Sequence, residues 1–160
     1  MVFLQRIVSG GQTGADRAAL DWAIQNGIAH GGWCPQGRWA EDGPLPSIYQ
    51  LRETPDNHPT QRTEWNVRDS DGTVIFSVDS ALKGGSKYTQ QCAVMHDKPC
   101  LHLRRDQSDR AADRLVEFIR DHRIKVLNVA GPRASSEPEV GPFVKAVLEE
   151  AWKRMHTMPV

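Results

Sequence analysis

Short apolar runs alternate along the chain with longer segments whose apolar residues recur at helical spacing. One run ends at Val8, and the others occupy residues 31–35, 73–78, 99–103 and 125–129. Short runs bounded by turn residues predict β-strands. The run at 73–78 is apolar almost throughout, which predicts a strand buried on both faces of a parallel sheet.

The segments between these runs predict helices. After the first run, small and apolar residues at helical spacing predict a helix over 15–26: Ala15, Ala18, Ala19, Trp22 and Ala23. Thr60 is the expected N-cap of a helix over 61–68, and Ser108 that of a helix with Ala111, Leu115, Phe118 and Ile119 on one face. The last helix is expected to begin near Pro142, with an apolar side formed by Val144, Val147, Leu148, Ala151 and Met155. This alternation predicts an α/β protein with a doubly wound, mainly parallel sheet and helices on both faces.

Three glycine-bearing loops follow predicted strands, at 9–14, 83–89 and 130–136. Ligands of doubly wound sheets bind outside the carboxyl ends of the strands, so we expect the three loops to face one crevice. Glycine lets the backbone approach a ligand closely, and a following helix directs unpaired N–H groups to the same place, which suits phosphate or another anion. The alternative is that the glycines only form turns. The first loop lacks the GxGxxG spacing of a dinucleotide-binding loop.

The candidate binding residues lie in or beside these loops. They are Gly10, Gly11, Thr13, Gly14, Asp16, Gly84, Gly85, Ser86, Thr89, Gly131, Arg133 and Ser135. Arg133, Arg38 and Arg62 each offer a guanidinium that can grip an oxyanion, although most surface arginines are only solvated. For Thr89 a helix-capping role is favoured, and for Asp16 a structural one.

A long segment at about 36–59 has no regular helical or strand pattern and is rich in proline. Loops of this length inside compact domains are commonly functional covers or disordered segments. The apolar content of this covering segment argues for a cover packed on the domain: Trp39, Leu45, Ile48, Tyr49 and Leu51.

Composition limits the class of protein. The 160 residues are the size of one domain, and we expect a single domain over 1–160. Its 20 basic and 20 acidic residues cancel, so bulk charge does not direct the protein to nucleic acid or to an anionic membrane. Three cysteines without a CxxC pair, and the lack of a signal peptide or spanning segment, favour a soluble cytoplasmic protein. The six histidines form no metal-binding pattern, so no protein-ligated metal is expected.

Six segments of the sequence together resemble one family. They are GGQTGADRAALDWAI, CPQGRWAEDGPLP, RTEWNVRDSDGT, GGSKYT, KPCLHL and NVAGPRASSEP, and they extend over nearly the whole chain. The chain resembles the circularly permuted YpsA-like proteins of the SLOG superfamily, which are labelled molybdenum carrier or molybdenum cofactor carrier proteins. The resemblance implies a Rossmann-like fold. It also relates the chain to the lysine decarboxylase-like phosphoribohydrolases, which act on nucleoside monophosphates.

The glycine loops resemble the nucleotide-binding loops of those hydrolases in a permuted order. GGQTGA is similar to their GGG loop, GGSKYTQQ to their PGGxGTxxE loop, and AGPRASSEP to their early loop moved to the C-terminus. Two departures matter: the motif acid appears as Gln91 or Cys92, and the motif proline as Lys83. Without that carboxylate the proton-transfer and ribose-binding group of the hydrolases is lost, so a binding protein is favoured over an enzyme.

The resemblance implies molybdenum cofactor (molybdopterin) or molybdate as a carried ligand, passed to molybdoenzymes or cofactor-insertion proteins. Two alternatives stay open. One is an enzyme or sensor for a nucleotide derivative, with a chemical role for Asp16 or Glu64, and the other is an interaction module with a vestigial crevice. Related folds and five tryptophans lead us to expect a homo-oligomer, either a dimer or a tetramer.

Overall fold

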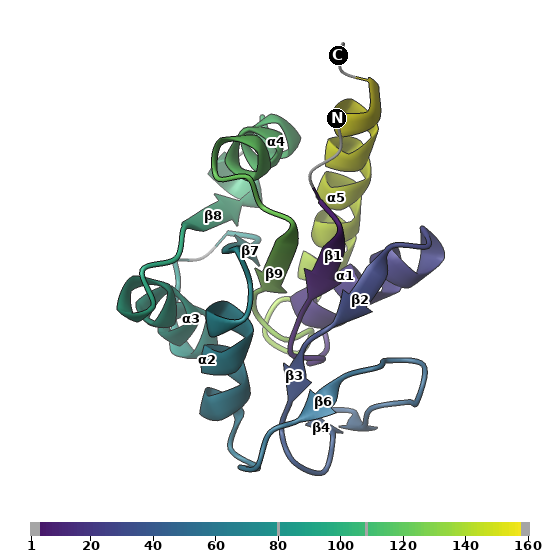
Figure 1. Ribbon diagram of the computed structural model, residues 1–160, viewed down its shortest axis with the longest axis vertical. Coiled ribbons are helices and arrows are strands. Elements are labelled where there is room, and N and C mark those ends of the chain that lie inside the picture. Colours follow the sequence, from purple (N-terminus) through teal and green to yellow (C-terminus); the bar gives the residue numbers. More distant parts are fainter. Residues whose placement is uncertain (1–3, 80, 108, 158–160) are drawn as a thin grey trace.

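The structure is a computed structural model that describes residues 4–79, 81–107 and 109–157. Its centre is a five-stranded sheet with the order β2-β1-β9-β7-β8, in which all neighbouring strands are parallel. The strands are β1 (Arg6–Val8), β2 (Ala29–Gly31), β7 (Gly72–Ser77), β8 (Cys100–Arg104) and β9 (Val126–Ala130). The last of them, β9, lies between β1 and β7 (Figure 1). The predicted doubly wound parallel sheet is confirmed.

Helices cover both faces of this sheet. On one face, α1 (Ala15–Gln25), α4 (Ala111–Asp121) and α5 (Val140–Thr157) share the main hydrophobic core. On the other, α2 (Pro59–Arg68) and α3 (Gly84–Met95) lie side by side, at the lower left of Figure 1. The predicted apolar sides of α4 and α5 are buried in that main core. The architecture is an α/β Rossmann-like fold.

The two faces of the sheet differ in polarity. Phe76 of β7 belongs to the main core, on the side of α1, α4 and α5. Because side chains alternate along a strand, Thr73 and Ser77 of β7 face α2 and α3. Thr73 accepts a hydrogen bond from Asn128 of β9 at 3.2 Å, and Ser77 is hydrogen-bonded to His102 of β8 at 2.7 Å. The sheet therefore presents polar groups beneath α2 and α3.

The start of α2 differs from the prediction. The helix begins at Pro59, whose fixed φ suits the first helical position. His58, and not Thr60, is therefore the N-cap, and its Nδ1 accepts a hydrogen bond from the Thr60 amide at 3.3 Å. Ser108, the expected cap of α4, lies outside the described residues.

The second glycine loop is also different from the prediction. Gly84 already opens α3, so residues 84–89 form the first turns of a helix and not a loop. Gly84 has a φ of 56°, a conformation that glycine adopts without a steric penalty. Thr89 does not cap a helix, because it lies inside α3 and its hydroxyl donates to the Gly85 carbonyl at 2.9 Å.

The covering segment contains short pieces of sheet. The predicted strand at 31–35 is split into the end of β2 and a separate β3 (Trp33–Cys34), which pairs in parallel with β6 (Arg52–Glu53). Between them, β4 (Trp39–Ala40) and β5 (Gly43–Pro44) form a small antiparallel pair. Leu45, Tyr49 and Leu51 are buried in a second hydrophobic cluster, whereas Trp39 and Ile48 are exposed. The expected packing of the segment is thus confirmed for three of its five large apolar residues.

One feature holds the covering segment in shape, and another allows it to pack against the first glycine loop. Arg38 donates hydrogen bonds to backbone carbonyls of the segment itself, including that of Tyr49 at 2.7 Å. Gly11 has a φ of 83°, and a Cβ there would lie 2.7 Å from Leu45 and 2.9 Å from Leu51. Gly11 is therefore needed for close packing of the segment on the loop.

Candidate ligand-binding cavity

A cavity of about 590 Å³ opens at the carboxyl ends of β1, β9 and β7. Five parts of the chain line it: the loop after β1, the first turn of α1, the helix α2, the segment from the end of β7 into α3, and the segment from β9 to residue 137. The strand order of the sheet reverses here, which is where ligands of doubly wound sheets bind. The volume lies in the range of small-molecule sites.

Most of the candidate residues line this cavity: Gly10, Asp16, Gly84, Gly85, Ser86, Thr89, Gly131, Arg133 and Ser135. The three glycine-bearing segments therefore meet at one place. Gly11, Thr13 and Gly14 lie beside it without lining it. Of the other arginines, Arg62 lines the cavity, whereas Arg38 is bound within the covering segment.

Side-chain and backbone groups of the protein itself form hydrogen bonds with the first glycine loop and the start of α1. Asp16, in the first turn of α1, accepts hydrogen bonds from the Gln12 amide at 3.3 Å and from Arg62 Nη1 at 3.2 Å. The Ala15 amide donates to the Pro132 carbonyl at 3.2 Å. A helix N-terminus attracts a negative charge, and at α1 the carboxylate of Asp16 supplies that charge from within the chain.

The ion pair between Asp16 and Arg62 is mostly buried, with side chains 9% and 13% exposed. Burial raises the pKa of Asp16, while the charge of Arg62 and the hydrogen bonds that the carboxylate accepts act against this shift. The guanidinium of Arg62 lies directly over Gly10, where any Cβ would collide with it. The pair therefore joins α2 to α1 across the wall of the cavity.

The N-terminus of α3 is open instead. Lys83 at the N-cap makes no side-chain hydrogen bond to the helix, and the first turn contains no acidic residue. A Cβ at Gly84 or at Gly85 would meet no atom within 4 Å. The first amides of a helix have no partner within it, so the first turn of α3 brings hydrogen-bond donors and the positive end of the helix dipole to the edge of the cavity, which Gly84, Gly85 and Ser86 line.

The third segment is tied to the first loop by backbone contacts. Thr13 Oγ1 accepts a hydrogen bond from the Ala134 amide at 3.1 Å, and a Cβ at Gly14 would lie 2.7 Å from the same nitrogen. Thr13 and Gly14 thus position the segment that carries Arg133. Hydrogen bonds from Ser135 and then Thr13 lower the pKa of Glu41, at the tip of the covering segment.

The charges around the cavity fall into three groups. Asp16 and Arg62 neutralise each other. Asp79 and Glu137 add negative charge, and the Glu137 carboxylate accepts a hydrogen bond from the Val78 amide at 2.6 Å. Lys83 and Arg133 are exposed and form no ion pair with another described residue. These last two cations can therefore turn to an incoming anion.

Several polar lining residues were missed by the sequence analysis. Thr63 and Asn66 of α2 lie 20 and 17 residues before the second glycine loop and belong to a different helix, so spacing could not associate them with it. Ser77 and Asn128 line the cavity from the sheet. Their signal was a polar residue within a mostly apolar strand, which is unfavourable unless the polar group has a partner or a ligand.

The residues at the hydrolase motif acid do not reach the cavity. Gln91 is exposed, whereas Cys92 is buried against Val67 and Tyr88. Glu64, the other candidate acid, is hydrogen-bonded to His96 at 3.0 Å and does not line the cavity. Of the two acids considered for a chemical role, Asp16 alone lies in the lining.

Two further properties bear on the kind of site. Within residues 4–79, 81–107 and 109–157, no group of three or more His, Cys, Asp or Glu side chains is arranged to hold a metal ion. None of the helices described above is long and apolar enough to cross a membrane.

The fold agrees with what known proteins show. The chain matches the circularly permutated YpsA SLOG family over residues 7–152, and it belongs to that family. It is similar to a crystal structure from Syntrophus aciditrophicus described as a "putative molybdenum carrier protein". The identity is 49%, the TM-score is 0.91, and the match covers 92% of this chain and 94% of that one. No curated protein matches the chain. The family resemblance drawn from the motifs is therefore confirmed.

Proposed function

We propose that this protein is a carrier that binds molybdenum cofactor, or a related anionic molybdenum or pterin ligand, in the cavity and releases it without turnover. The observation that carries the proposal is the open N-terminus of α3, where uncapped amides and two unobstructed glycines line the cavity. The name of the Syntrophus protein, which has the same fold at 49% identity, supports a molybdenum-related ligand.

The size and charge of the cavity suit such a ligand. A volume of about 590 Å³ accommodates a heterocycle with an attached phosphate, and it is far larger than an oxyanion alone requires. The phosphate or oxo-metal end would be held by the amides of Gly84, Gly85 and Ser86 and by the cations Lys83 and Arg133. The polar side chains of α2 and of the sheet would then contact the heterocycle.

The arrangement of acids favours binding over hydrolysis. A carboxyl group that acts as a general acid or base must be able to exchange its proton with the ligand. Asp16 is instead engaged by Arg62 and the Gln12 amide, and Gln91 and Cys92 do not line the cavity. The rival function is a nucleotide-derivative sensor or a nucleoside-monophosphate hydrolase. Asp79 and Glu137 are the lining acids that would have to serve it.

Thermal unfolding with three probes tests the proposal. Extracted molybdenum cofactor, molybdate and nucleoside monophosphates are added separately, and a ligand that binds the native state raises the melting temperature by mass action. We expect the cofactor to give the largest shift, molybdate a smaller one and the nucleotides none. A shift with a nucleotide together with released base would contradict the carrier function.

Removing one charged side chain from the lining tests whether the cofactor-induced melting shift comes from this cavity. Arg133→Gln should reduce the cofactor-induced shift, because it removes one cation that is free to contact the ligand. Lys153→Gln serves as the control, since Lys153 is an exposed lysine near the end of α5 and does not line the cavity. Equal shifts in both variants would mean that the cofactor binds elsewhere.

A further inference from the structure

A second cavity of about 340 Å³ lies beside the first, at the carboxyl end of β8. The two cavities share Ala81 and Leu82, which separate them. The remaining lining consists of Lys87 and Gln90 of α3, His102 and Arg104 of β8, and Gln107. Every polar side chain in this lining can donate a hydrogen bond, and none is a carboxylate.

Arg104 is held rigidly at the edge of this second cavity. Its Nε and Nη2 donate to the two carboxylate oxygens of Asp106 at 3.0 and 2.8 Å, and Nη2 also donates to the Asp79 carbonyl at 3.0 Å. Nη1 has no hydrogen-bond partner among the described residues. A guanidinium fixed in this way loses little conformational freedom when it binds a further acceptor.

Lys87 adds a charge that the chain does not balance. Its ammonium group forms no ion pair with any residue in the described ranges. Because Asp106 balances Arg104, the lining keeps one uncompensated positive charge when His102 is neutral. An anion is the ligand that this charge favours.

His102 makes the lining respond to an anion. Its Nε2 is hydrogen-bonded to Ser77 at 2.7 Å. Burial lowers the pKa of His102, and Arg104 and Arg114 lower it further, whereas Glu137 raises it. Lys87 is the other charged group in the lining around the ring. A bound anion would favour the imidazolium form and so raise this pKa.

We infer that the second cavity is a separate binding site for a small oxyanion of the phosphate class, held by Lys87, Arg104 and His102. The site does not depend on the proposed function of the main cavity. Free inorganic phosphate and the phosphate group of a small metabolite offer the same chemistry here. Because the cavity is larger than phosphate itself, a phosphorylated small molecule should bind at least as well as the free ion.

NMR titration of the histidine ring signals tests this site. The His102 signal is assigned by its loss in His102→Gln, and its pKa is measured at constant ionic strength in chloride, in inorganic phosphate and in glycerol phosphate. We expect both phosphate compounds to raise the pKa of His102 in the intact protein. A response to inorganic phosphate alone would restrict the site to the free ion and contradict its extension to phosphorylated metabolites.

Three single substitutions separate this site from its alternatives. Lys87→Gln should weaken the phosphate response about fivefold, as expected for the loss of one partly exposed charge pair. Arg133→Gln, which alters the main cavity, and Lys153→Gln, a remote exposed lysine, should both respond like the original protein. The site is disproved if phosphate leaves the His102 titration unchanged, if Lys87→Gln responds fully, or if the response is lost in Arg133→Gln.

Discussion

Two helices begin at the same edge of the sheet after a buried strand, α1 shortly after a pair of glycines and α3 with a pair of glycines as its first residues, yet their N-termini are not equivalent. At α1 no side chain caps the helix either, but the Ala15 amide donates to the Pro132 carbonyl and the Arg17 amide to the Gln12 carbonyl, and the first turn carries the carboxylate of Asp16. At α3 no such backbone partner or first-turn acid is found among the described residues, and a Cβ at Gly84 or at Gly85 would meet no atom within 4 Å. One N-terminus is occupied from within, whereas the other is available to a ligand.

The difference shows what a glycine loop does and does not predict. Glycines mark where the backbone turns sharply or packs closely, and both helices needed that. Whether an anion can bind depends on the first helical turn, where α1 carries Asp16 and α3 carries Ser86. An acidic residue in the first turn of a helix that follows a glycine loop therefore argues that the site is already filled.

The largest expected difference in stability is between substitutions of a glycine before α1 and of a glycine at the start of α3. Gly14→Val places a branched side chain at a φ of 82° and against the backbone of the third segment, so we expect the free energy of unfolding to fall by about 4 kcal/mol. Gly85→Ala meets no atom and should raise it by about 0.5 to 1 kcal/mol. Urea unfolding measures both. Similar losses in the two variants would show that α3 is as closely packed as α1.

The next effect concerns the charge pair that closes α1. Arg62→Gln leaves the buried Asp16 without its cation and should cost about 3 kcal/mol at neutral pH. Since burial raises the pKa of Asp16 above its unfolded value, the folded protein gains a proton more readily, and this group adds stability as the pH falls through its folded pKa. The loss should therefore shrink on acidification.

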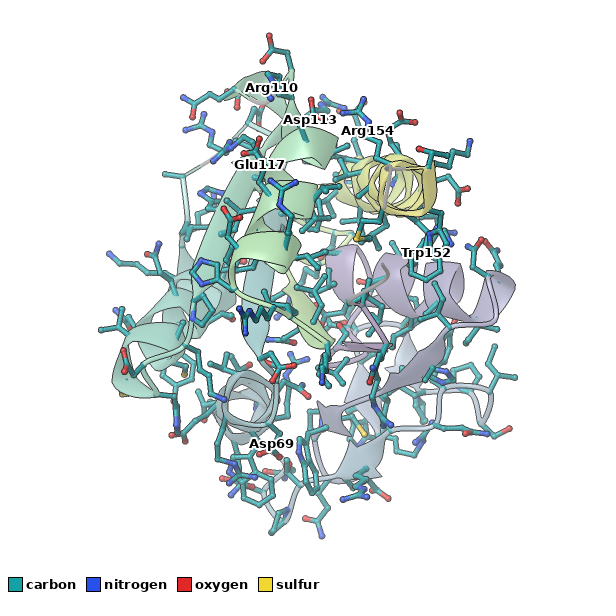
Figure 2. All side chains as sticks on the ribbon, turned by 45° about the horizontal axis from the view of Figure 1, so that its top comes forward. Asp69, Arg110, Asp113, Glu117, Trp152 and Arg154 are labelled. Carbon is teal, nitrogen blue, oxygen red and sulfur yellow. The ribbon has the colours of Figure 1, made fainter. Side chains whose placement is uncertain are left out.

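Arg68→Gln is the matched control for Arg62→Gln on the same helix. Arg68 is 42% exposed and pairs with its neighbour Asp69, which Figure 2 shows near the end of α2. Its loss should cost less than about 1 kcal/mol. A loss of stability in Arg62→Gln that equals this control, or that does not change with pH, would argue against the closed end of α1.

A third substitution converts the open end into a closed one. Lys83 has the extended backbone of an N-cap, so Lys83→Asp should cap α3 and raise the free energy of unfolding by about 1 kcal/mol. The new carboxylate would occupy the anion position and lower the affinity for molybdate by about tenfold or more. Calorimetric titration and urea unfolding give the two values.

Arg110→Ser provides the control for capping alone. Arg110 is the N-cap of α4, where it makes no side-chain cap and lies away from the cavity lining. This variant should gain stability from the new cap with unchanged affinity for molybdate. If both variants, or neither, lost affinity, α3 would not be the binding end.

The smallest effect is expected in the charge network between α4 and α5. Figure 2 shows Arg110, Asp113, Glu117 and Arg154 gathered there, and Arg154 bridges Asp113 and Glu150. Arg154 and Asp113 are 40% and 37% exposed, so solvent screens the pair and Arg154→Gln should cost less than about 1 kcal/mol. It should leave molybdate binding unchanged. A change in affinity would show that charges far from α3 also hold the anion.

Most of the fold could be predicted because strand and helix signals are local. The nearly continuous apolar run at 73–78 indicates a buried strand by itself, and the helical spacing of apolar residues from Val144 to Met155 indicates a helix by itself. Local signals did not locate the start of α3, since a glycine pair is typical of a loop, whereas Gly84 and Gly85 are the first residues of this helix. The roles of Gly11 and Gly14 likewise depend on partners more than thirty residues away.

The candidate site was predictable in position and only partly in detail. Topology alone brings Gly10, Gly85 and Gly131 to one cavity. The part that α2 plays in the cavity could not be predicted from local sequence. Arg62 pairs with Asp16, which lies 46 residues away in the chain, and Asn66 lines the cavity from the same helix. The ion pair between Arg62 and Asp16 beside the first glycine loop is therefore a long-range contact that local signals do not indicate.

Amide chemical shifts during a molybdate titration test the difference between the two helix ends most directly. We expect the signals of Gly84, Gly85 and Ser86 to move with molybdate concentration, while those of Gly10 and Gln12 stay close to their original positions. Shifts confined to the loop before α1, with the first turn of α3 unchanged, would contradict the open N-terminus of α3 as the anion site.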